Sequence, residues 1–109
     1  MKMDRNINPN GGGKYAIVNL RRVRELAATL DAGSVVHALD VLKNYGVLDM
    51  GMVRTESEFF LIKLKDRHAR AALLAYERSI EPTDPEFALE VAELAARAGK
   101  LSPFCKEPD

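Results

Sequence analysis

The sequence has few of the features that mark particular classes of protein. Its single cysteine, Cys105, rules out an internal disulfide framework. Its sixteen basic and sixteen acidic residues cancel, so it lacks the net positive charge that favours nucleic acid or anionic membranes. No apolar run approaches the roughly 20 residues that span a bilayer, and residues 1–13 lack the apolar segment of a secretory signal. These absences predict a cytoplasmic protein with no membrane partner.

Residues that carry catalysis or bind metals are equally sparse. The two histidines, His37 and His68, together with Cys105 match no zinc-ligand spacing. The glycine-rich stretch 10–14 precedes a predicted strand, whereas a phosphate-binding loop follows a strand and leads into a helix. No pair of nucleophile and base can be identified. We therefore predict no catalytic residue, no metal site, no cofactor and no enzymatic activity.

What the sequence does contain is typical of one small globular domain. Apolar residues make up 47% of the 109 residues, which is enough for a single core. Residues 1–13 are polar and include three consecutive glycines, and such a stretch buries too little surface to offset its ordering entropy. We predict a flexible arm at residues 1–13, a single globular domain at 14–101 and a C-terminal tail at 102–109.

Two segments have the alternating apolar pattern of β-strands. Residues 14–20 and 59–64 are rich in β-branched and aromatic side chains, and each runs into a segment with helical periodicity. Residues 47–55 are ambiguous, because they fit either a short strand broken by Gly51 or a loop.

Four amphipathic helices are predicted to follow these strands in pairs. They cover residues 21–30, 34–46, 66–80 and 84–99. Ser34 and Asp84 are the expected N-caps, with Pro85 in a first turn, and Gly46 and Gly99 are expected to end the second and last helices. The expected buried side of the second helix consists of Val35, Ala38, Leu39, Val41 and Leu42.

The two halves of the chain share one order of elements: strand, helix, helix, glycine. Because strands joined by a long helical crossover usually run parallel, residues 14–20 and 59–64 are expected to lie side by side with their carboxyl ends at one edge. The prediction is an α+β fold with a small sheet of two to four strands covered by about four helices. If residues 47–53 supply a further strand, the order becomes a ferredoxin-like βααββαα arrangement with a pseudo-repeated strand–helix–helix unit.

Basic residues follow both predicted strands. If the strands are parallel, the basic residues that follow each of them come together at one edge of the sheet. Two helix N-termini add partial positive charge at the same edge. Phosphate, nucleic acid or an acidic protein surface could bind there, although no aromatic side chains interleave as they do in single-strand binders. The alternative is that these basic side chains are exposed to solvent and bind nothing, with Asp66 paired to Arg70. The candidate binding residues of this basic edge are Arg21, Arg22, Arg24, Lys63, Lys65, Arg67 and Arg70.

Opposite charges concentrate in two parts of the chain. Residues 1–24 hold six basic residues and one acid, whereas residues 77–93 hold six acids and one arginine. Such polarity can steer a partner or bring two copies together head to tail. The alternative is a chance difference between solvated faces.

The last predicted helix has a narrow polar stripe, formed by Glu90, Glu93 and Arg97, and is otherwise apolar and rich in alanine. An outer helix needs only one apolar stripe, so this helix could cover the core and also meet another surface. The alternative is that alanine favours a helix on any face. The candidate interface residues are Phe87, Leu89, Ala92 and Ala96.

The sequence therefore predicts a small non-enzymatic protein-interaction protein, of accessory, regulatory or inhibitory kind, that self-associates. Its predicted partner is another protein, a second copy in a homodimer, or both. The alternative is a protein that binds nucleic acid or another polyanion at the basic edge. Nucleic acid is the less favoured partner, because the chain is neutral overall.

Overall fold

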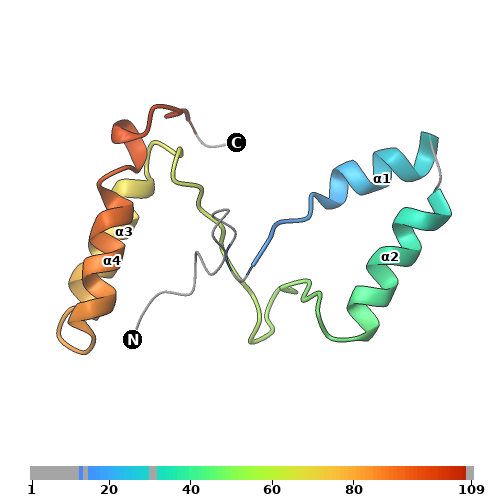
Figure 1. Cartoon of the computed structure of the whole chain (residues 1–109), viewed down its shortest axis with the longest axis horizontal. Coiled ribbons are helices and arrows are strands. Elements are labelled where there is room, and N and C mark those ends of the chain that lie inside the picture. The colour runs from blue at the N-terminus through green and yellow to red at the C-terminus, as the bar shows by residue number, and fades with distance from the viewer. Residues whose placement is uncertain (1–12, 14, 30–31, 108–109) are drawn as a thin grey trace. The chain divides into compact units, whose positions relative to one another are not determined.

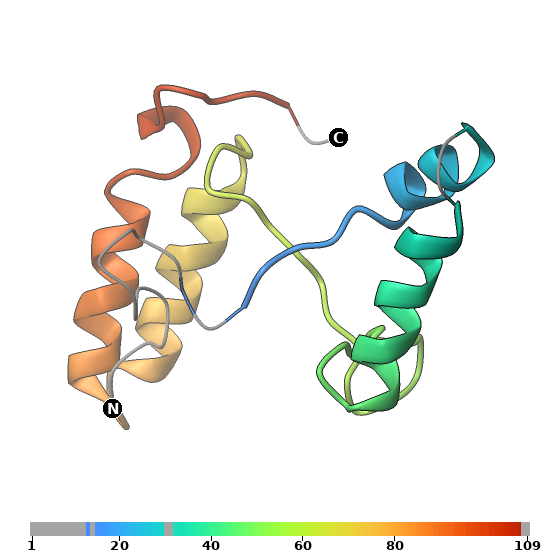
Figure 2. The ribbon, with the colours of Figure 1, turned by 45° about the vertical axis from the view of Figure 1, so that its right-hand side comes forward.

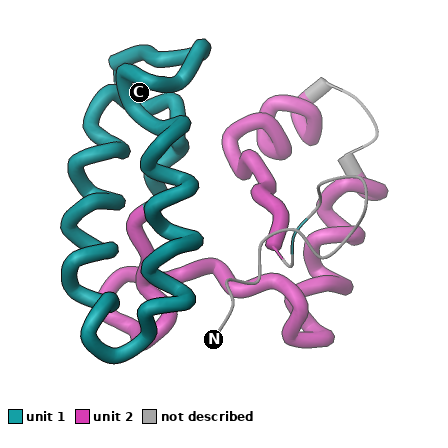
Figure 3. Tube along the Cα trace, turned by 60° about the vertical axis from the view of Figure 1, so that its left-hand side comes forward, with its two compact units in different colours: residues 1–14, 61–109 teal, residues 15–60 magenta. Residues whose placement is uncertain are grey.

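The computed structural model describes residues 13, 15–29 and 32–107. This part of the chain contains four α-helices and one short 3-10 helix (Figure 1). They are α1 (Leu20–Thr29), α2 (Ala32–Asn44), α3 (Ala69–Ile80), α4 (Pro85–Ala95) and η1 (Gly99–Leu101). The chain divides into two compact units, which we call the α1–α2 unit (residues 15–60) and the α3–α4 unit (residues 1–14 and 61–109) (Figure 3).

The prediction of an α+β fold is wrong, and with it the ferredoxin-like arrangement. The described residues contain no β-strand and no sheet, and their only β-type pairing is an isolated parallel bridge between Asp66 and Lys106. Residues 15–19 and 59–63, which were expected to be strands, are irregular. An alternating apolar pattern shows that a segment suits a pleated surface, but a strand also needs a neighbour that satisfies its backbone groups. The pattern of one segment does not show whether such a neighbouring strand exists.

All four expected helices are present, although their bounds differ from the prediction. The third begins at Ala69 rather than Asp66, because Asp66 forms a turn in which its Oδ1 accepts a hydrogen bond from the His68 N–H at 2.8 Å. The predicted arm, apart from Gly13, lies outside the described residues, as do Lys14, Leu30 and the end of the tail. The predicted boundaries at 1–13, 14–101 and 102–109 stay predictions.

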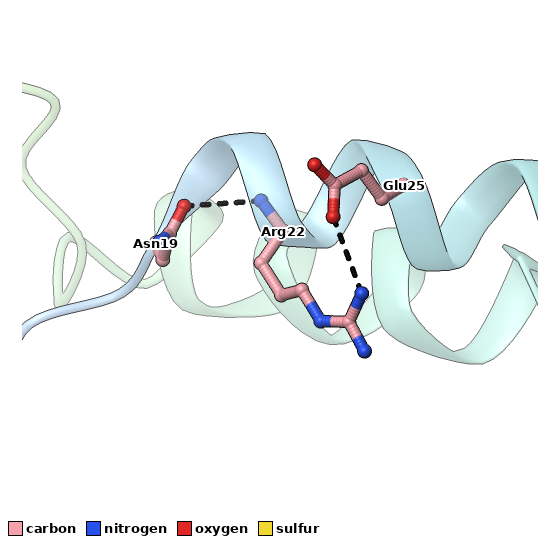
Figure 4. A network of polar contacts seen from close by, with 3 residues as sticks. All are labelled: Asn19, Arg22 and Glu25. Atoms are coloured by element: carbon pink, nitrogen blue, oxygen red, sulfur yellow. Dashed lines mark hydrogen bonds and ion pairs between the residues drawn. The ribbon is translucent and has the colours of Figure 1, made fainter.

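The first helix is capped by a residue that the sequence pattern had placed in a strand. Asn19 precedes α1, and its Oδ1 accepts a hydrogen bond from the Arg22 N–H at 3.0 Å (Figure 4). This satisfies one of the free amides of the first turn. The Arg22 side chain forms a 3.2 Å ion pair with Glu25, one turn further along the helix, and both side chains are exposed to solvent.

In the α1–α2 unit, the two helices pack together along a thin seam (Figures 1 and 2). The half-buried apolar side chains of the two helices recur at helical spacing, as side chains that face a partner helix do: Val23, Leu26, Ala27, Val35 and Leu39. Helix α2 ends at Asn44 and is capped as predicted by Gly46, whose φ of +71° lets the Val47 N–H reach back to the Leu42 carbonyl at 2.9 Å. Residues 47–60 are irregular, and none of the described side chains of this unit is buried.

In the α3–α4 unit, two helices joined by a short turn lie side by side (Figures 1 and 2). The predicted cap of α4 is confirmed: Asp84 accepts a hydrogen bond from the Phe87 N–H at 3.1 Å, and Pro85 occupies the first turn. The rings of Tyr76 and Phe87 lie 6.1 Å apart at a tilt of 45°. The buried apolar core consists of Ala69, Ala88, Val91, Leu94, Ala95 and Ala98.

A third segment closes this hairpin. After α4, the Gly99 N–H donates to the Leu64 carbonyl at 2.8 Å. Further along, Lys106 donates to Lys65 and accepts from Arg67, both at 2.9 Å. Residues 99–107 therefore pack back against the segment that leads into α3, and they complete a core that two helices alone would leave open.

Candidate interaction surface

The α1–α2 unit exposes an unusual amount of apolar surface. Its most exposed large apolar side chains are Phe60, 88% exposed, and Tyr15 and Tyr45, each 82% exposed. Isolated exposed apolar residues are ordinary, but an extensive set in one small unit marks a binding surface. The set among the described residues is Tyr15, Ile17, Val18, Leu20, Val36, Val41, Leu42, Tyr45, Val47, Met50, Met52, Val53, Phe59 and Phe60.

The most exposed members lie outside the helices. Tyr15 and Ile17 belong to the segment before α1, and Val53, Phe59 and Phe60 belong to the segment after α2. Local hydrogen bonds order this second segment, because Asp49 accepts from the Gly51 N–H at 2.9 Å. That bond lowers the pKa of the Asp49 carboxyl, and a bond from Ser57 adds to the effect. We call the residues 15–19 and 47–60 the apolar flanks of the unit.

Helix α2 carries a second apolar face beside its seam with α1. Ala38, Val41, Leu42 and Tyr45 recur at spacings of three and four residues and therefore share one side of the helix. Tyr45 follows the last residue of the helix, but its N–H still bonds to the Val41 carbonyl at 3.1 Å, so it continues the helical path. All four are exposed. We call them the α2 face.

The sequence pattern alone merges the α2 face with the seam. It predicts that Val35, Ala38, Leu39, Val41 and Leu42 are all buried, whereas only Val35 and Leu39 are even half-buried. The sequence does indicate that α2 carries more apolar surface than one seam requires. The apolar residues of α2 span a wider arc than the single stripe needed to pack one helix against another.

The predicted basic edge has lost its structural basis. Its seven residues divide between the two units, and the parallel strands that were expected to bring them together are absent from the described chain. Three of the seven have partners: Arg22 pairs with Glu25, Arg67 with Glu107 at 2.7 Å, and Arg70 donates to the Ala95 carbonyl at 2.9 Å. Among the described residues, no such side-chain partner is seen for the remaining four, Arg21, Arg24, Lys63 and Lys65.

Arg67 and Arg70 of this edge interact with groups of their own unit. The Glu107 carboxylate raises the pKa of the Arg67 guanidinium through its hydrogen bond and its charge. In place of the Asp66–Arg70 pair of the alternative interpretation, Arg70 bonds to the last turn of α4, where carbonyl groups favour a cation. Polyanion binding at these residues stays a prediction.

The predicted interface on α4 divides into two parts. Leu89, Ala92 and Ala96 lie on one side of the helix, where Leu89 and Ala96 are exposed and Ala92 is half-buried. Phe87 lies on another side, half-buried next to Tyr76 of α3. This surface offers one large exposed side chain, so it is much smaller than the apolar surface of the α1–α2 unit.

The α3–α4 unit also has an apolar groove with a volume of about 210 Å³. It is lined by Ile62, Leu64, Ala69, Ala72, Leu73 and Tyr76. Apart from the Tyr76 hydroxyl these side chains are apolar, so the groove is suited to hold an apolar side chain.

His37, His68 and Cys105 are all exposed. Among the residues that the structure describes, no three histidine, cysteine or acidic side chains lie close enough to hold a metal ion. None of the helices in the described part of the chain has the length and hydrophobicity needed to cross a membrane.

No protein-family model, no curated protein and no solved structure matches this chain. The observation that bears most directly on function is therefore the apolar surface of the α1–α2 unit.

Proposed function

We propose that this is a small non-enzymatic protein-interaction protein, of accessory, regulatory or inhibitory kind, that binds another protein through the apolar flanks of its α1–α2 unit. One observation carries the proposal. The unit exposes fourteen large apolar side chains, and none of its described side chains is buried.

The exposed area is large enough to drive binding. With roughly 150 Å² for a whole large apolar side chain, the nine large apolar residues of the apolar flanks expose on the order of 900 Å². Burying half of this area would contribute on the order of 11 kcal/mol. That gain is comparable with the estimated cost of association, which runs from about 4 to 15 kcal/mol.

A protein is the partner that this surface fits best. Aromatic and methionine side chains, such as Tyr15, Met52 and Phe60, are enriched at the centres of protein interfaces. A polyanion would require a cluster of cations, and the α1–α2 unit mixes five basic with six acidic residues. A cytoplasmic location is part of the proposal, supported by the single cysteine of the chain.

The test is capture of partners from native lysate by the full chain, with and without nuclease. Phe60→Ser and Tyr15→Ser remove exposed side chains of the apolar flanks, and Leu89→Ser removes an equally apolar exposed side chain from the α3–α4 unit as the matched control. We expect a partner protein that survives nuclease, is retained by Leu89→Ser and is lost with the two flank variants. A partner that disappears with nuclease, or that all three variants retain, would contradict the proposal.

A further inference from the structure

We propose that the α2 face is a dimer interface and that its occupant is the α2 face of a second copy of this chain. The inference goes beyond the proposed function, because it concerns a different surface of the same unit. The apolar flanks bind the other protein, and the α2 face joins two copies of the chain.

The small size of the unit is the first argument for a second copy. The α1–α2 unit spans residues 15–60, and its helices share only a half-buried seam. Units of this size commonly depend on disulfides, metals or oligomerisation for stability. The one cysteine of the chain, Cys105, lies in the other unit, so no disulfide can form within this one. Pairing with a second copy gives the two helices a third and a fourth to pack against.

The chemistry of the α2 face is the second argument. A symmetric dimer places the same patch of both copies in contact, so the patch must be complementary to itself. Ala38, Val41, Leu42 and Tyr45 include no charged side chain, so two copies can approach without repulsion between like charges. The charged residues Asp40 and Lys43 lie on the opposite side of the helix, where they stay in solvent.

The sizes of the four side chains favour one relative direction of the two helices. In an antiparallel pair centred between Val41 and Leu42, the small Ala38 of one copy lies opposite the large Tyr45 of the other. Each Val41 then lies opposite a Leu42. A parallel pair would place two tyrosines together and leave a gap between two alanines. Alternation of large and small side chains gives the closer packing, so we infer the antiparallel arrangement.

The area of the face is a substantial part of what a dimer needs. From the exposed fractions of its side chains, the face presents on the order of 250 Å² of apolar surface. A standard interface takes about 800 Å² from each partner, of which a little more than half is apolar. The α2 face therefore supplies roughly half of the apolar part of a standard interface. We expect a dimer of modest affinity that dissociates on dilution.

Two valines on opposite sides of α2 make the experiment specific. Val41 is 37% exposed and belongs to the α2 face, whereas Val36 is 44% exposed and lies on the side of Asp40 and Lys43. Val41→Asp and Val36→Asp thus place the same charge on the same helix at similar exposure.

The molar mass of the full chain and both variants is measured by sedimentation velocity over a range of concentrations. We expect the wild type and Val36→Asp to reach twice the 12.1 kDa of one chain. Because Val41→Asp buries two facing carboxylates, it should raise the dimer dissociation constant at least about 100-fold.

Tyr45→Ser separates loss of the dimer from loss of folding. The Tyr45 side chain is 82% exposed, so its removal takes little packing from the single chain. It should weaken the dimer about tenfold while the helical circular dichroism stays unchanged. The inference is overturned if the wild type is monomeric at every concentration. It is also overturned if Val36→Asp weakens the dimer as much as Val41→Asp does, or if Tyr45→Ser leaves its affinity unchanged.

The outcomes for the dimer and for the proposed function are distinguishable. A monomeric wild type that still captures a protein through Tyr15 and Phe60 overturns the dimer and supports the proposed function. A dimer that depends on Val41 but captures no other protein supports the dimer and contradicts the proposed function.

Discussion

The two halves of this chain have the same order of elements but differ in burial. Each has an irregular segment, a helix, a short connection, a second helix and a glycine with positive φ, Gly46 or Gly99. In the α3–α4 unit, six apolar side chains are buried. In the described part of the α1–α2 unit, no side chain is buried.

The segment after the second helix accounts for the difference. After α4, residues 99–107 return to the segment before α3 and bond to it at Leu64, Lys65 and Arg67. After α2, the backbone bonds within residues 47–60 connect near neighbours, such as Thr55 with Met52. Two short helices bury only the seam between them, and in the α3–α4 unit a third segment covers more of their apolar surface. The α3–α4 unit contains its third layer, and we propose that the α1–α2 unit obtains one from a second copy.

The largest expected effect comes from the closed core. Leu94 is 7% exposed, and Leu94→Ala should lower the free energy of unfolding of the α3–α4 unit by about 2–4 kcal/mol through lost contacts and a cavity. Leu39 is the matched leucine in the seam of the α1–α2 unit, where it is half-buried. Leu39→Ala in dilute protein should cost roughly 1 kcal/mol, because solvent already reaches that side chain. Urea titration followed by amide NMR signals reports each unit separately. Equal losses for the two leucines would show that the α1–α2 unit has a closed core of its own.

The two glycines provide a second comparison, of intermediate size. Gly99 has a φ of +59°, and a Cβ at this position would lie 3.0 Å from the Arg67 carbonyl oxygen. Gly99→Ala should therefore destabilise the α3–α4 unit by roughly 1–3 kcal/mol, from backbone strain and from crowding of the closing segment. Gly46 has a φ of +71° with no atom within 4 Å of such a Cβ. Gly46→Ala should cost about 1 kcal/mol, from backbone strain alone. Thermal unfolding of both variants measures the difference, and a larger effect at Gly46 would contradict the account.

The smallest expected effect concerns the helix caps. The Phe87 N–H donates to the Asp84 carboxylate and lowers its pKa from the ordinary 3.8. The stabilisation is therefore present at and above pH 3.8 and is lost as the pH falls from there through the lowered pKa. Asn19 caps α1 with a neutral amide, so that cap should not respond to acid. Asp84→Asn keeps an acceptor but does not titrate, so it should reduce the acid sensitivity of the α3–α4 unit. Unfolding curves between neutral pH and pH 3 test this, and unchanged acid sensitivity in Asp84→Asn would refute it.

Local features of this fold could be predicted from the sequence, and features that depend on distant partners could not. Asp84 with Pro85 and the C-cap at Gly46 are predictable because a cap requires only a few adjacent residues. The segments at 15–19 and 59–63 have a local preference for strands that no neighbouring segment fulfils in the described chain. The closing of the α3–α4 unit by Lys106 was not predicted, because backbone hydrogen bonds across forty residues leave no periodic pattern.

Prediction of the candidate site from the sequence is limited in the same way, because it depends on which surfaces pack together. A helix with one apolar stripe is assigned a buried side from its sequence alone. Helix α2 has two adjacent apolar faces, and the sequence pattern does not show which of them packs against α1. On α4, the narrow polar stripe indicated an interface, but much of the apolar surface of this helix is the core of the unit, including Val91 and Leu94.

The central claim is that the α1–α2 unit is completed by a second copy of the chain, whereas the α3–α4 unit is complete by itself. Amide hydrogen exchange of the full chain, measured at a high and at a low concentration, tests both parts of this claim in one experiment. The account predicts that amides of α1 and α2 are protected at high concentration and lose protection on dilution, while amides of α3 and α4 exchange equally slowly at both. Protection of α1 and α2 that does not change with concentration would contradict it.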